Sequence, residues 1–264
     1  MIPALLWKEW REQRWRMILS VFVLATISAS LVRAQLIPTP EAILLSFGVL
    51  GLILTIFLSM GSVATERQDG TWPFTLSQPI PRPTILRVKW LIGALNLLIA
   101  LLFSGLAVTW AAWSRNLYAL DGPPAWLTER VSIITDNPNS ALWTWRIIVL
   151  SCVSLLSLFT VLFFLLTRAR NELHAGLGGI LLTFIILAWL LQYLSVRHTG
   201  GAFGGLHAWE KAFWYSALIN PLSPIAFMFE SLRVQACAVT LSVTLWTILP
   251  LTLIGAADRR RTRR

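Results

Sequence analysis

Six long apolar runs with almost no charge constrain this chain more than any other feature of its sequence. The hydrocarbon core of a membrane is about 30 Å thick, so a helix needs about 20 apolar residues to cross it. Runs of this length cover residues 17–37, 42–65, 90–113, 147–167, 175–196 and 236–257, and Arg33 is the one charged residue in them. We therefore predict an all-α integral membrane protein with six transmembrane helices in a single domain over residues 17–264.

The composition supports a membrane protein and weakens the other classes that a basic chain suggests. Hydrophobic residues make up 56% and charged residues 13%, against about 45–50% and 25% in soluble domains. The formal net charge is +10, but the basic residues are spread between the apolar runs instead of gathering on one arm, so we expect no nucleic acid partner. Cys152 and Cys237 lie within apolar runs, which disfavours a disulfide framework or a cysteine metal site.

The distribution of lysine and arginine predicts which side of the membrane each connection faces. Segments 1–16, 66–89, 168–174 and 258–264 hold 15 basic residues in 54, whereas segments 38–41, 114–146 and 197–235 hold 6 in 76. Cytoplasmic loops carry the excess of basic residues. We therefore expect a multi-pass protein of the plasma or inner cell membrane with both termini in the cytoplasm, and we expect Arg33 to extend to the headgroups.

The first 16 residues have the pattern of an amphipathic helix that lies on the cytoplasmic surface of the membrane. Leu6 and Trp10 recur at helical spacing with charged residues between them, which favours one apolar face and one polar face. The alternative is a secretory signal peptide with residues 17–32 as its apolar region. Glu9 and Glu12 make such a leader unusually acidic, and cleavage would leave five spans, so we favour the surface helix.

The sequence lacks the residues that common catalytic sites require. A phosphate-binding P-loop needs glycine directly before lysine, and none of the three lysines, Lys8, Lys89 and Lys211, follows a glycine. The metalloprotease and serine-hydrolase motifs are absent, and the three histidines lie far apart in the sequence, so we expect no catalytic residue, metal site or bound cofactor in this chain. The uncharged runs also disfavour an ion-coupled carrier, which needs ionisable groups within the membrane.

The connection between the second and third runs has the signals of a short helix. Gly70 permits a sharp turn, Thr71 is a good N-cap, and Pro73 is tolerated in the first turn. Because Pro79 would stop the helix, we predict a helix over residues 72–78. It would present apolar side chains for docking into another protein or, alternatively, would rest on lipid headgroups. These side chains are Trp72, Phe74 and Leu76.

Two motifs resemble those of the permease subunits of ABC-2 type transporters, which are six-span components of ATP-driven exporters. The first motif follows the second run and consists of Glu66, Arg67, Gly70, Thr71, Leu76, Pro79 and Arg82, with Lys89 before the third run. The second is similar to the N-terminal interfacial elbow helix of the family and includes Lys8, Glu9, Trp10 and Arg11. Trp72 and Pro73 depart from the pattern, because the family commonly has leucine or isoleucine and then an acidic residue there.

The resemblance implies an ABC-2 type exporter permease fold, with residues 1–16 as the elbow helix and residues 66–89 as a coupling loop. A second permease chain, identical or different, would complete the pathway, and a separate cytosolic ABC ATPase would bind ATP and Mg²⁺. The ATPase would bind the elbow helix and the coupling loop. The coupling residues would be Glu66, Arg67, Gly70, Thr71, Phe74, Leu76, Pro79 and Arg82, and those of the elbow Lys8, Glu9, Trp10 and Arg11.

Three further expectations complete the sequence-based hypothesis. We expect Glu66 to form an exposed pair with Arg67, with Arg82 or with a basic residue of the ATPase. The resemblance also implies an outer re-entrant segment within residues 212–235, because residues 220–229 are too short and too proline-rich to cross a membrane. Two other functions stay open, namely a membrane assembly or maturation factor driven by a partner ATPase, and a membrane enzyme such as an acyltransferase.

Overall fold

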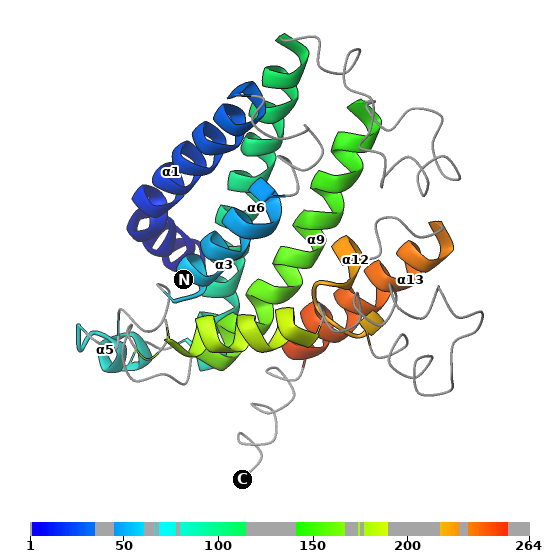
Figure 1. Cartoon of the computed structure of the whole chain (residues 1–264). Helices are drawn as coiled ribbons and strands as arrows, with labels where there is room; N and C mark the ends of the chain where they lie inside the picture. The colour runs from blue at the N-terminus through cyan, green and yellow to red at the C-terminus, as the bar shows by residue number, and fades with distance from the viewer. Residues whose placement is uncertain are drawn as a thin grey trace, which may run out of the picture.

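The computed structural model describes ten segments of the chain: residues 2–34, 45–60, 66, 69–77, 80–114, 141–166, 174, 177–189, 217–226 and 232–252. Within these segments the regular structure is entirely helical, which confirms the predicted all-α class for this part of the chain. Figure 1 shows long helices packed side by side into a bundle, with the short helix α5 standing away from it.

Among the described residues, four helices are long and apolar enough to cross a membrane. The three longest are α1 (Ile2–Ala34), α6 (Arg82–Ser114) and α9 (Ala141–Leu166), and the fourth combines α13 (Leu232–Val243) with the π-helical turn η2 (Thr244–Ile248). The candidate spans within them are Pro3–Ala34, Arg82–Ser114, Trp145–Leu165 and Arg233–Thr252. They correspond to the first, third, fourth and sixth apolar runs.

The second and fifth apolar runs are represented by shorter helices. The π-helical turn η1 (Ser46–Leu50) continues into α3 (Gly51–Met60), and a second helix covers Leu177–Trp189. Both are shorter than the length that crosses a hydrocarbon core, and the rest of each run lies outside the described residues. Figure 1 draws the Leu177–Trp189 helix in yellow-green across the lower end of α9 and not alongside it.

Two helix starts differ from the sequence-based expectation. Helix α1 is continuous from Ile2 into the first run, because residues 4–34 contain neither proline nor glycine to interrupt it. Helix α6 begins at Arg82, so the last eight residues of the predicted loop are helical. The Pro81 carbonyl accepts the first hydrogen bonds of α6, from the Thr84 and Ile85 amides, and Pro83 lies in the first turn, where a missing N–H costs nothing.

Helices α1 and α6 pack in parallel along most of their length. The hydrogen-bonded pairs between them rise together in residue number: Glu9 with Lys89, Gln13 with Asn96, and Ser28 with Ser104. Because both helices start at the same end of the bundle, the chain between them runs back to that end. Helix α3 runs in that return direction, because the Arg16 guanidinium of α1 lies 6.0 Å from the centre of the Phe57 ring near the end of α3.

The remaining long helices, α9 and α13, run in the direction opposite to α6. Helix α9 is antiparallel to α6, since the indole N–H of Trp90 donates to Thr160 near the end of α9 over 3.1 Å. Helix α13 is parallel to α9, with Ser242 Oγ donating to Ser157 Oγ over 2.8 Å in the second half of each helix. Beyond η2, near the C-terminal end of the same helix, the Arg87 guanidinium of α6 donates to the Leu251 carbonyl. The starts of α1 and α6 and the end of the α13 helix therefore lie at one end of the bundle.

Glycine permits the close approach of α6 to α9. A Cβ atom at Gly93 would stand 2.6 Å from the Phe159 ring, far inside van der Waals contact. Both residues lie in the buried seam between the helices, where Phe159 is fully buried. Side-chain size at position 93 therefore sets the spacing of these two helices.

The segment over residues 217–226 packs inside the bundle. It ends in the short helix α12 (Ser223–Ala226) and contacts α9 and α13. The side-chain amide of Asn220 donates to the Ile186 carbonyl over 3.1 Å, and the backbone amide of Ile225 donates to Ser154 Oγ over 3.0 Å. Because Ser154 lies at the middle of α9, this part of the predicted re-entrant segment reaches into the bundle and does not lie on its surface; the rest of residues 212–235 before α13 lies outside the described residues.

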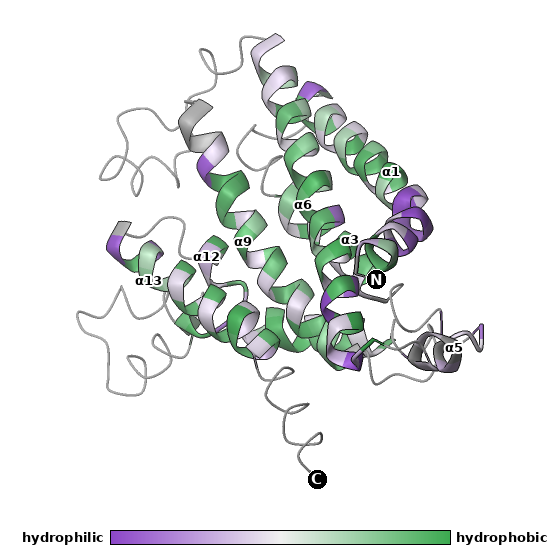
Figure 2. Cartoon of the chain, turned by 180° about the vertical axis from the view of Figure 1, so that it is seen from behind, coloured by the Kyte–Doolittle hydropathy of each residue, from purple (hydrophilic) through white to green (hydrophobic). Residues whose placement is uncertain are grey.

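The surface of the long helices is apolar, as a lipid-facing surface requires. Figure 2 shows green, hydrophobic colours along most of α1, α6 and α9, with purple near the end of α1 that carries the N-terminus. Large apolar side chains on α1, such as Phe22, are exposed. Near the opposite end, the Arg33 guanidinium lies 5.5 Å from the ring centre of the exposed Trp110, an arrangement that favours the membrane interface.

Candidate functional site

A buried ion network joins three parts of the chain at the end of the bundle where α1 and α6 begin. The Lys89 ammonium lies 2.7 Å from Glu9 Oε1 and 2.9 Å from Glu66 Oε1. The side chains of Lys89 and Glu9 are each 1% exposed, and that of Glu66 is 10% exposed. One ammonium group from α6 therefore holds a carboxylate from the predicted elbow and another from the segment after α3.

The helices place these charges next to an apolar cluster. Leu5 lies one turn before Glu9 on α1, and Ile85 lies one turn before Lys89 on α6; both are buried together with Val88. Buried charges lose their hydration, and truncation of one partner of a buried pair costs about 3–5 kcal/mol because the other charge stays behind. The positions of Glu9, Glu66 and Lys89 therefore depend strongly on one another.

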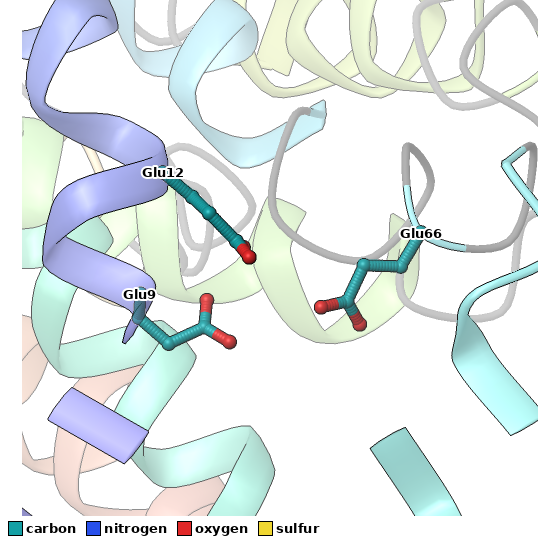
Figure 3. Close-up of side chains that lie close together, drawn as sticks. All are labelled: Glu9, Glu12 and Glu66. Carbon is teal, nitrogen blue, oxygen red and sulfur yellow. The ribbon is translucent and has the colours of Figure 1, made fainter. Parts of the chain in front are cut away.

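A second lysine extends the network toward solvent. The Lys8 ammonium lies 3.3 Å from Glu66 Oε1 and 3.7 Å from Glu12 Oε1, and its side chain is 37% exposed. Figure 3 shows the carboxylates of Glu9, Glu12 and Glu66 turned toward one another, with one oxygen of each within 4.8 Å of the others. The ammonium groups of Lys8 and Lys89 lie between these carboxylates, so the five side chains form one ion network.

One acceptor in the network has no partner among the described residues. The second carboxylate oxygen of Glu66, Oε2, is buried and receives no hydrogen bond there. An unsatisfied buried acceptor is costly. A hydrogen-bond donor that reached Glu66 Oε2, or a movement that exposed it to water, would therefore stabilise the network.

Backbone hydrogen bonds connect Glu66 directly to α5 (Trp72–Ser77). The Glu66 carbonyl accepts from the Thr71 amide over 2.9 Å and from the Thr71 hydroxyl over 3.3 Å. Gly70 has a φ of +70°, a left-handed conformation that glycine adopts without strain. The Thr71 carbonyl then accepts from the Thr75 amide, so Thr71 is the N-cap and only one turn separates Glu66 from α5.

The structure brings some of the residues with predicted roles together and leaves others apart. Lys8, Glu9 and Glu66 belong to the ion network, and Gly70 and Thr71 form the turn before α5. Trp10 is half-buried, whereas Arg11 and Arg82 are exposed and contribute no ion pair to the network. Phe74 and Leu76 are part of α5, but their side chains, like all of Arg67 and Pro79, lie outside the described residues.

Sequence reasoning missed the ion network itself. It expected an exposed pair of Glu66 with Arg67, with Arg82 or with a basic residue of the ATPase, whereas the described carboxylate is nearly buried and pairs with Lys89 and Lys8. The reason is the early start of α6, which places Lys89 two turns inside a helix and against α1. The available signal was a lysine immediately before an apolar run, because such a charge needs a partner at the membrane interface.

No family model matches the chain, and no curated protein matches it significantly.

Proposed function

We propose that this chain is the permease subunit of an ATP-driven transporter of the ABC-2 type, worked by a separate cytosolic ATPase. The observation that carries the proposal is the connection from α5 through Glu66 to Lys89 and Glu9. Helix α5 stands away from the bundle (Figure 1), where a cytosolic partner could reach it. A force applied to α5 would therefore act on α1 and α6 together.

The direction of the helices supports the six-span arrangement that this function needs. The parallel packing of α1 and α6 is compatible with one return crossing between them, and that of α9 and α13 is compatible with another. With the two returns counted as spans two and five, the chain crosses six times and both ends lie on the side of the ion network. The balance of basic residues makes that side the cytoplasm.

One feature of the sequence supports a separate ATPase chain. The chain has no P-loop lysine, so ATP hydrolysis belongs to the partner in this proposal. We further propose that two permease chains, identical or different, form the pathway between them.

The test measures two quantities for each variant. They are binding of the ATPase to the purified chain and ATP hydrolysis by the complex in proteoliposomes. Phe74→Asp should leave membrane insertion normal but weaken ATPase binding about 10- to 150-fold, because burial of a phenylalanine in a partner groove contributes about 1.5–3 kcal/mol. Ser77→Asp is the matched control, since it adds the same charge at an exposed, already polar position of α5. Intact ATPase binding by Phe74→Asp would contradict the docking role of α5.

A further inference from the structure

A groove between α1 and the η1–α3 helix opens on the apolar surface of the bundle. Its volume is about 180 Å³, and apart from Ser20 its lining is apolar. Leu19, Val23 and Ile27 line it from α1, while Ile53 and Phe57 line it from the other side. All five side chains are also exposed, so the groove is open to whatever surrounds the helices.

The dimensions of the groove match one leaflet of a membrane. Residues 19 to 27 of α1 cover about 12 Å at a rise of 1.5 Å per residue. Half of the hydrocarbon core is about 15 Å thick. One acyl chain lying along α1 would therefore fill the groove within the leaflet nearest the ion network.

Cationic and aromatic side chains stand at the headgroup end of the groove. The Arg16 guanidinium lies 6.0 Å from the ring centre of Phe57, which lines the groove. Trp15 is 68% exposed with the Arg14 guanidinium 5.7 Å from its ring centre, and exposed tryptophans mark the headgroup level. Arg16 thus lies at the depth of lipid phosphates, at the mouth of an apolar groove.

We propose that this groove binds one acyl chain of an anionic phospholipid whose headgroup lies against Arg16. The positive charge at the mouth favours an anionic headgroup over a neutral one. It also disfavours a second copy of this chain, because a symmetric contact through the same groove would bring two Arg16 side chains together. The proposal is independent of the ATPase and of the direction of transport.

The experiment measures lipid binding to the purified full-length protein by native mass spectrometry. Phosphatidylglycerol and phosphatidylcholine with identical acyl chains are the two probes. The wild type should prefer phosphatidylglycerol, and Arg16→Gln should lower that preference about fivefold, whereas Arg16→Lys should keep it. Arg14→Gln is the matched control and should also keep it, because the Arg14 guanidinium lies over Trp15, which does not line the groove, whereas the Arg16 guanidinium lies over the groove residue Phe57.

A groove-filling variant separates the apolar part of the site from the charge. Val23→Phe should weaken binding of both lipids, because it occupies the space of the acyl chain at a position that is 43% exposed and tolerates a larger side chain. Equal binding of the two lipids by the wild type would overturn the proposal. So would equal losses in Arg14→Gln and Arg16→Gln, or a Val23→Phe variant that dissociates a dimer and leaves lipid binding unchanged.

Discussion

Replacement of Lys89 by methionine tests whether the ion network holds the end of the bundle together. Methionine has a similar length and no charge, so the substitution leaves the Glu9 and Glu66 carboxylates in place without the ammonium between them. Both carboxylates are almost completely buried, and the expected loss is about 3–5 kcal/mol. At about 2–4 °C per kcal/mol for domains of 150–250 residues, this loss corresponds to a melting temperature lower by about 6–20 °C.

The assay is thermal unfolding of the purified protein in detergent, with two comparisons. Lys8→Met is the matched control, because Lys8 belongs to the same network but is 37% exposed, and exposed pairs contribute about 0–1 kcal/mol. The double variant Glu9→Gln, Lys89→Met removes both members of the closest pair and should recover part of the lost stability. Equal melting temperatures for Lys8→Met and Lys89→Met, or a double variant less stable than Lys89→Met, would refute the reasoning.

Three further predictions concern helix packing, the embedded segment and topology. Gly93→Ala should destabilise the protein by about 1–3 kcal/mol, because its Cβ would overlap the Phe159 ring. The control Gly48→Ala meets no atom within 4 Å and should stabilise the protein by about 0.5–1 kcal/mol. A thermal scan in which both variants shift the melting temperature in the same direction would contradict this prediction. Asn220→Ala should lower the stability of the protein by about 1–3 kcal/mol, because it leaves the Ile186 carbonyl and the Leu222 backbone amide unpaired. The measurement is the rate of proteolysis after position 220, which should rise. An unchanged rate would count against the position of residues 217–226 inside the bundle. In a variant without native cysteines, cysteines at Gln78 and Gly204 should react from the cytoplasm and from outside, respectively, and reaction of position 204 from the cytoplasm would remove the fifth span.

The sequence predicts well those elements whose signals are local. The short helix expected over residues 72–78 is α5, Trp72–Ser77, because a glycine with positive φ, a threonine cap and two prolines determine its ends. Four of the six apolar runs coincide with helices of sufficient length and hydropathy. In each case, residues within one or two turns decide the conformation.

The ion network was beyond sequence reasoning because its members are far apart in the chain. Glu9 and Lys89 are separated by 80 positions and Glu66 and Lys89 by 23. Their contact depends on the packing of α1 against α6 and on the start of α6 at Arg82, within the coupling loop expected over residues 66–89. A pattern of charges indicates that a partner is needed, but only the packing of the helices identifies it.

The most direct test of the proposed function is the composition of the complex purified from the native membrane. The tagged full-length chain is extracted in mild detergent, and the mass of the intact particle is measured together with the identity of its subunits. The proposal predicts two permease chains and two copies of a P-loop ATPase, and a loss of the ATPase in Phe74→Asp but not in Ser77→Asp. A particle that contains this chain without any ATPase would contradict it.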